Sequence, residues 1–300
     1  VGAVFEQPAQ SFVGAAHHAD AVESVGLKRQ TTLISQNVHP PALVEVAAHA
    51  RVDEGVGVQV VVARVVVAEH KRACSDIDML GRLRFSSHRD FQRAFERAVR
   101  RAGVPVAFSA GFSPHPRISY ANAAPTGIGS EAEYLEIALT RPCDVGNVQR
   151  VLDRALPPDL DIVEVVEART PDFAERLEAS VWRIECFDID SHVIAAAVDA
   201  LLRADAVEVS RLTKQGIRTF DVRHAVLDLA LESSSQPNCA ILRLVVRHTT
   251  PAVRPDDVLQ ALASVGSLTM ETPARVTRCS QGPLTADTRD VSDPFAPDRV

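Results

Sequence analysis

The order of apolar runs and helix signals along the chain constrains its fold more than any other feature. LRF at 83–85 is typical of a short strand, and Ser86 or Ser87 can begin a helix that Gly103 and Pro105 end. Strand-like segments follow at VAFSA and ISYANAAP, and YLEIALT at 134–140 alternates like a half-buried strand. Asp144 can then cap a second helix, ended by Pro157, before the alternating strand at 161–168. The predicted order is β-α-β-β-α-β.

The second half of the sequence repeats this order. A strand at 182–189 precedes a helix that Ser191 opens, and strands are expected at 206–212, 218–231 and 240–248. Pro255 suits the first position of a helix over 256–264, and METPARVTR supplies a final strand. We therefore expect the α+β class, with two ferredoxin-like (βαββαβ) halves and antiparallel sheets.

These signals predict four regions, namely 1–78, 79–168, 169–281 and 282–300. Residues 79–168 and 169–281 are the two halves, and the Pro- and Asp-rich segment 282–300 is expected to be a disordered tail. Residues 1–78 hold VGVQVVVARVVVAEH, which has no turn residues and no helical period. This run fits one or two strands, or an extension outside the fold with a natural start near Met79. The second interpretation is favoured, so deletion of 1–78 is expected to leave the stability nearly unchanged.

Composition limits the class of protein and its cofactors. Nearly half of the 300 residues are apolar, at 46%, yet no run of eighteen apolar residues exists, so we expect no membrane partner. Five cysteines at wide, irregular spacing favour reduced thiols in a cytoplasmic protein over a disulfide framework. Their spacing also lacks the local cysteine cluster that a radical-initiating iron–sulfur centre needs. No cofactor and no metal site are expected.

Positive charge is concentrated in one block of an acidic chain. The net charge is −7, yet the segment from Met79 to Tyr120 contains eight arginines and only two acidic residues, Asp90 and Glu96. Arg89, Arg93 and Arg97 recur every four residues, so they line one side of the first predicted helix. A basic side on an acidic chain favours an anionic partner such as RNA, although pairing with acids elsewhere in the fold is the alternative.

Three further groups are candidates for anion binding. His88 and Arg89 lie at a helix N-terminus, where free amides attract phosphate. The prolines of Pro114-His115-Pro116-Arg117 restrict the backbone and would present His115 and Arg117 rigidly, for binding or proton transfer or simply as a turn. Lys214 and Arg218 flank the turn at Gly216 and suit a phosphate backbone or a solvated surface.

The segment RLRFSSHRDFQRAFERAVRRAGVPVAFSAGFSPHPRISYANAAPTGIGSEAEYLEIAL carries a family resemblance. Its SHRD, GF-x-PHPRIS and SEAEYLEI motifs resemble the bacterial radical SAM-linked protein family, over about Gly81 to Ser280. One departure is that ACSDIDML stands where the family has a basic, alternating first strand.

The resemblance implies a cobalamin-binding radical SAM protein as the partner, because members of that family are often encoded beside such a protein or fused to it. With the basic block, it suggests an accessory or substrate-binding module that is directed at RNA and has no catalytic residue of its own. Two alternatives are a stand-alone enzyme using His88 and His115 for acid–base chemistry, and a pure protein–protein adaptor.

Overall fold

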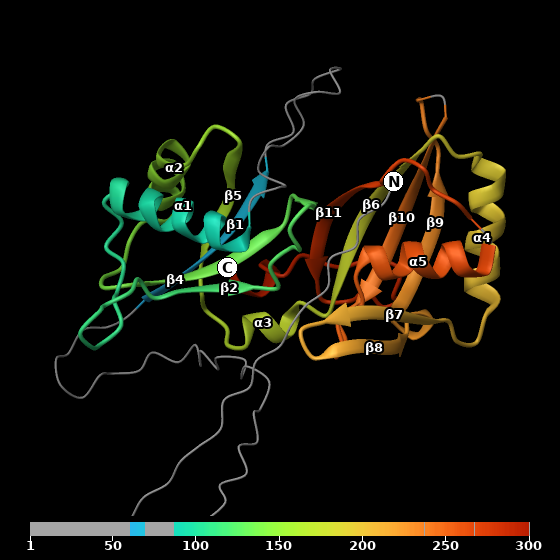
Figure 1. Cartoon of the computed structure of the whole chain (residues 1–300). Coiled ribbons are helices and arrows are strands. Elements are labelled where there is room, and N and C mark those ends of the chain that lie inside the picture. The colour runs from blue at the N-terminus through green and yellow to red at the C-terminus, as the bar shows by residue number, and fades with distance from the viewer. Residues whose placement is uncertain (1–60, 70–86, 237, 267, 300) are drawn as a thin grey trace, which may run out of the picture. The chain divides into compact units, whose positions relative to one another are not determined.

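The first sheet contains four strands in the order β2-β4-β1-β5, and every neighbouring pair is antiparallel. The computed structural model describes residues 61–69, 87–236, 238–266 and 268–299. The strands are β1 (Val61–Glu69), β2 (Ile118–Ala121), β4 (Glu133–Leu139) and β5 (Leu160–Glu167). The helices α1 (His88–Arg101) and α2 (Val145–Ala155) cover one face, with Phe95, Leu135 and Leu152 in the core between them (Figure 1). The class is α+β, as the sequence predicts.

The central strand β1 overturns the expectation that the Val-rich run lies outside the fold. It pairs with β4 on one side and β5 on the other. Val65 and Val67 face the helices, whereas Arg64 and Val66 are buried on the opposite face. A strand buried on both faces has no apolar–polar alternation, and this is why its period could not be recognised. Residues 1–60 and 70–86, including the LRF strand expected at 83–85, lie outside the described residues.

The second sheet has the order β3-β11-β6-β10-β9. Its strands are β6 (Ala179–Phe187), β9 (Val226–Glu232), β10 (Cys239–Arg247) and β11 (Arg275–Gly282), and the two-residue β3 (Gly129–Ser130) adds in parallel to β11. The helices α4 (Ser191–Arg203) and α5 (Pro255–Gly266) pack on this sheet around a core that includes Ile194, Leu244 and Val258 (Figure 1).

Between α4 and β9 in the sequence, the chain forms a separate hairpin. The expected strands at 206–212 and 218–231 are instead β7 (Glu208–Thr213), β8 (Gly216–Asp221) and β9. The 3₁₀ turn η2 (Arg223–Ala225) divides the second run, so β7 and β8 form a sheet of their own. The VAFSA segment forms only the isolated bridges Val106↔Leu139 and Phe108↔Pro116.

The C-terminal segment corrects a second expectation, because residues 283–299 are packed rather than disordered. Phe295 is 1% exposed and lies against Phe173 of the short helix α3 (Phe173–Arg176) and Tyr134 of β4. The 3₁₀ turn η3 (Ala296–Asp298) follows, and Asp298 pairs with the buried Arg64. The tail therefore provides the counter-charge for an arginine in the central strand.

Candidate nucleic-acid interface

Helix α1 begins where its local sequence predicts. The Ser87 hydroxyl accepts a hydrogen bond from the Asp90 backbone N–H at 3.3 Å, and the Asp90 carboxylate accepts one from the Ser87 N–H at 3.3 Å. This capping box satisfies two amides that a helix start leaves free. Phe95, Ala98 and Val99 form the buried side of the helix. The opposite side of α1 is therefore exposed to solvent.

The exposed side of α1 carries five arginines within about a third of the helix circumference. We call them the arginine face: Arg89, Arg93, Arg97, Arg100 and Arg101. Among the described residues, the one ion pair made by this face joins Arg93 to Asp90 at 4.0 Å, with both side chains mostly exposed. Such pairs contribute little to stability and are screened by salt. Within the described part of the chain, most of the positive charge of the arginine face therefore has no counter-charge.

His88, at the N-terminus of α1, differs from the arginines in being half-buried. Its ring contacts Tyr120 edge-on at 5.3 Å, and its Nε2 lies 2.9 Å from the Gln92 side-chain amide. Burial lowers the pKa of His88, and the negative charge of Glu133 opposes this only in part. The lowered pKa favours the neutral imidazole, which can form a hydrogen bond beside the charged Arg89.

A cavity of about 250 Å³ opens beside His88 and is also lined by Arg97, Ser130 and Glu133. The Glu133 carboxylate forms an ion pair with the buried guanidinium of Arg278. Arg278 also donates to the Ser130 hydroxyl at 3.2 Å. Glu133 is thus held in an ion pair with a buried partner, and Arg97 is an exposed cation that lines this cavity.

His115 and Arg117 lie elsewhere, on the loop that links α1 to β2. Both side chains are exposed, and His115 does not line the cavity beside His88. The Ser109 N–H donates to the His115 carbonyl at 2.9 Å, and the His115 N–H donates to the Ser109 hydroxyl at 3.0 Å. The backbone at His115 is therefore fixed while its ring faces solvent, and the two histidines do not converge on one reacting centre.

Lys214 and Arg218 are exposed on the β7–β8 hairpin, which packs on the core of the second sheet. Arg211 of the same hairpin is not available, because it pairs with Asp257 at 2.7 Å. No contact among the described residues joins Lys214 or Arg218 to the arginine face. The hairpin is consequently a second basic surface and not part of the first.

Sequence reasoning missed a buried serine–histidine pair. The Ser180 hydroxyl and His248 Nε2 are 2.6 Å apart, and the His248 Nδ1 lies 3.2 Å from the Asn122 amide. Burial lowers the pKa of His248. The partners are far apart in the sequence, so no local motif could reveal them. Ser180 is 1% exposed in β6 and does not line the cavity beside His88, which indicates a structural contact rather than a nucleophile.

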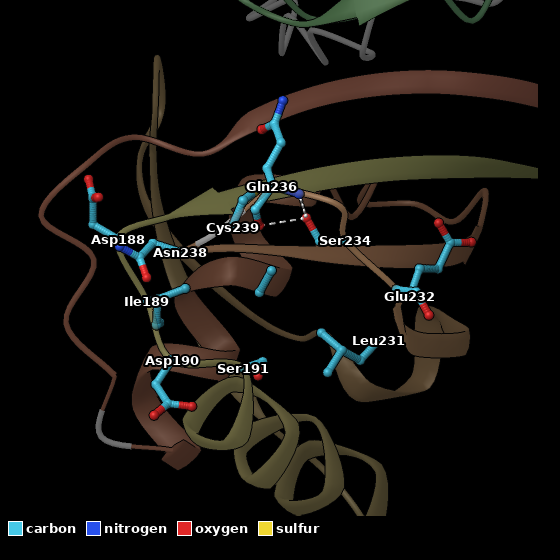
Figure 2. Close-up of a pocket in the computed structure, with 12 residues that line it drawn as sticks. Asp188, Ile189, Asp190, Ser191, Leu231, Glu232, Ser234, Gln236, Asn238 and Cys239 are labelled. Carbon is cyan, nitrogen blue, oxygen red and sulfur yellow. Dashed lines mark hydrogen bonds between the residues drawn. The ribbon is translucent and has the colours of Figure 1, made fainter.

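A larger hollow of about 760 Å³ lies at one end of the second sheet, but its groups do not converge. Figure 2 shows the carboxylates of Asp188, Asp190 and Glu232 pointing in different directions. Ser234 and Gln236 bond to each other across the adjoining turn, at 3.1 and 3.2 Å. We therefore assign no chemistry to this hollow.

The described residues hold neither a cluster of metal ligands nor a helix that could span a membrane. No group of three or more His, Cys, Asp or Glu side chains in that part of the chain is placed to hold a metal ion. None of the helices described there is long and apolar enough to cross a membrane.

Comparison with known proteins identifies the family. Residues 75–255 match the family described as "Uncharacterized protein conserved in bacteria (DUF2344)". The chain belongs to this family. No curated protein matches it significantly. Among solved structures, a chain of "Crystal Structure of a Cbf5-Nop10-Gar1 Complex" is similar at 8% identity and a TM-score of 0.30. That match covers 73% of this chain and 58% of the other, so this chain spans less than two thirds of the matched structure.

All the candidate binding residues lie inside the segment that matches DUF2344, from His88 to Arg218. The strand β1, central in the first sheet, and the strand β11, between β3 and β6 in the second, lie outside it, although each contributes to a sheet. The DUF2344 segment therefore holds the candidate surfaces, and flanking residues complete the fold that positions them.

Proposed function

We propose that this protein is an RNA-binding accessory module that presents substrate RNA to a cobalamin-dependent radical SAM enzyme. The observation that carries the RNA part is the arginine face, because five exposed guanidiniums on one helix have a single weak ion pair among the described residues. Guanidinium forks bind phosphate oxygens in pairs, which suits them to a nucleic-acid backbone. The proposal of an enzyme partner rests on the resemblance to the radical SAM-linked family.

The strand orders support a finer fold assignment, with each half ferredoxin-like. The series β2-β4-β1-β5 and β9-β10-β6-β11 place equivalent strands in equivalent positions. Many RNA-binding domains of this topology stack bases on the open face of the sheet. Here that face of the first sheet is covered, because Phe173 and Phe295 pack on Tyr134 with ring centroids 5.7 and 5.3 Å away. RNA would therefore bind on the helical side, where the arginine face lies.

The geometry disfavours the stand-alone enzyme. That alternative needs His88, His115 and a carboxylate around one substrate, yet His88 lines a cavity from which His115 is absent. Glu133, a carboxylate that lines this cavity, is already paired with Arg278. In the adaptor alternative, the arginine face binds an acidic protein surface instead of RNA. Measurements of RNA affinity and of enzyme capture therefore distinguish an adaptor from an RNA-binding module.

The test is the affinity of the full chain for a short fluorescein-labelled single-stranded RNA, measured by anisotropy over a range of salt concentrations. Replacing Arg89, Arg93 and Arg97 together by Gln should weaken binding. It should also reduce the slope of log affinity against log salt by roughly 0.7 for each phosphate that the helix no longer neutralises. Folding should persist because Gln is a good helix former and the buried side of α1 is unchanged.

A matched control replaces Arg150, Arg154 and Arg203 by Gln. These arginines are also exposed on helices, and Arg203 is paired with Asp199 at 3.0 Å. The control should bind RNA like the wild type. Equal losses in both triple variants would indicate a diffuse effect of net charge and contradict a specific face.

Co-expression with a cobalamin-binding radical SAM protein encoded beside a member of the family tests the partner. Co-purification of the two proteins, with RNA bound, supports the whole proposal. If the wild type shows no RNA affinity at low salt but captures the enzyme through the arginine face, the module is an adaptor and the RNA proposal is wrong.

A further inference from the structure

The loop Phe108–Pro116 carries the most exposed aromatic side chain in the described part of the chain. Phe112 at its tip is 110% exposed and Phe108 at its base is 48% exposed. Exposed single apolar residues are common, but a fully solvated aromatic on a braced loop leaves its large apolar face available to a ligand.

Contacts at the base and two prolines restrain this loop, and a glycine permits the bend at its tip. The bridge Phe108↔Pro116 and the two hydrogen bonds between Ser109 and His115 close its base. Pro114 and Pro116 restrict the backbone on the returning side. Gly111, just before Phe112, has a φ of +122°, which a residue with a side chain rarely adopts. The base of the loop is therefore restrained, which lowers the conformational entropy lost when a ligand contacts Phe112.

The charges around the loop favour one kind of ligand. Arg117 is exposed just after Pro116, while its backbone N–H is fixed by the Ala107 carbonyl at 2.8 Å. On the other side, Arg100 and Arg101 end α1 shortly before the loop begins. An exposed aromatic ring on a loop that arginines precede and follow in the sequence suits an unpaired nucleotide, whose base stacks while its phosphates contact cations. A purely apolar partner would gain nothing from these charges.

We propose that Phe112 is a stacking platform for an unpaired base of single-stranded RNA whose backbone runs along the arginine face. This inference rests on the proposed function and adds to it that the RNA is single-stranded. A paired base within a duplex cannot offer its face to a side chain, so only an unpaired base can stack on Phe112. The exposed ring of His115 belongs to the same loop and can contact the flanking sugar or phosphate.

The experiment compares three variants of the full chain on a labelled single-stranded RNA. Phe112→Ala should weaken binding by roughly tenfold, the usual effect of removing one base–aromatic stack. Phe112→Trp should keep the wild-type affinity, and Phe112→Leu should not, because Leu is apolar without an aromatic face. The salt dependence should stay at the wild-type slope, since no charge is removed.

The matched control is Val193→Ala on α4, where Val193 is 48% exposed and aliphatic. It should leave the affinity unchanged. A second control uses a blunt-ended RNA duplex of the same sequence, in which every base is paired. Its affinity should be insensitive to Phe112→Ala, because no base face inside the duplex is free to stack.

Each outcome has a distinct meaning. Arginine-dependent RNA binding that is unaffected by Phe112→Ala overturns the stacking inference alone. Wild-type affinity in Phe112→Leu as well as in Phe112→Trp would show a general apolar contact and overturn it too. Failure of Phe112→Ala to capture the radical SAM enzyme, with intact RNA binding, would make the loop a protein-docking element and also overturn stacking. No RNA affinity in the wild type would overturn both this inference and the proposed function.

Discussion

Arg64 of the central strand β1 and Asp298 near the end of the chain form an ion pair in which both side chains are fully buried. Arg64 also donates to Glu136 at 2.9 Å, and Arg176 donates to Asp298 at 3.0 Å. The second carboxylate oxygen of Asp298 accepts hydrogen bonds from the Thr170 N–H and hydroxyl. One carboxylate therefore joins the tail, the segment before α3 and the first sheet.

Replacing Asp298 by Asn should destabilise the protein by about 3 kcal/mol, because the buried Arg64 loses one of the two acidic partners it has among the described residues. Urea unfolding followed by the fluorescence of Trp182 measures this. Asp287→Asn is the control, since Asp287 lies in the same tail but is exposed. A loss as small as that of the control would show that the tail adds nothing to the fold.

Acid should weaken the same contact. Burial alone raises the pKa of Asp298, but hydrogen bonds from Thr170, the Arg169 N–H, Arg64 and Arg176 outweigh it and lower the pKa from 3.8 to about 2. A lowered folded-state pKa gives stability that is present above the unfolded value and lost as pH falls through the folded one. The shift corresponds to about 2 kcal/mol. The stability difference between wild type and Asp298→Asn should therefore shrink between about pH 4 and pH 2, and a difference constant over this window would contradict the linkage.

Removing residues 1–78 should abolish cooperative unfolding, because β1 fills the centre of a four-stranded sheet. Calorimetry of a chain beginning at Met79 tests this. Val65→Asp should produce a similar loss by burying a charge, since Val65 is 0% exposed, whereas Val163→Asp in β5 should be tolerated because Val163 is 53% exposed. A sharp, native-like transition in the shortened chain would mean that β1 is dispensable after all.

Glu133→Gln should lower the pKa of His88 further. Burial lowers the pKa of His88, and the charge of Glu133 is the opposing influence, so its removal leaves burial unopposed. A pH titration of the His88 ring by NMR measures the change. Glu96→Gln is the control. Glu96 lies on α1, the same helix as His88, but is not among the groups that shift the pKa of His88. An unchanged pKa of His88 in Glu133→Gln would show that the ring does not sense Glu133.

Short-range signals in the sequence determined most of the elements. The capping box of Ser87 and Asp90, the stripe through Phe95 and Ala98, and Asp144 as the cap of α2 all act within one or two helical turns. Pro255 likewise begins α5 as expected. The arginine face followed from the same spacing, since a four-residue repeat and a helix fix which side the charges share.

Tertiary structure decided what depends on partners distant in the chain. The Val-rich run became β1 because two neighbouring strands pair with it and both of its faces are buried. No signal in the local sequence predicts those partners. The tail became ordered because Arg64 needs a buried counter-charge that Asp298 supplies. Exposure too is a property of the folded chain. Sequence placed His88 and His115 together as candidates, whereas packing left one half-buried beside Tyr120 and set the other on a braced loop with Phe112 in solvent.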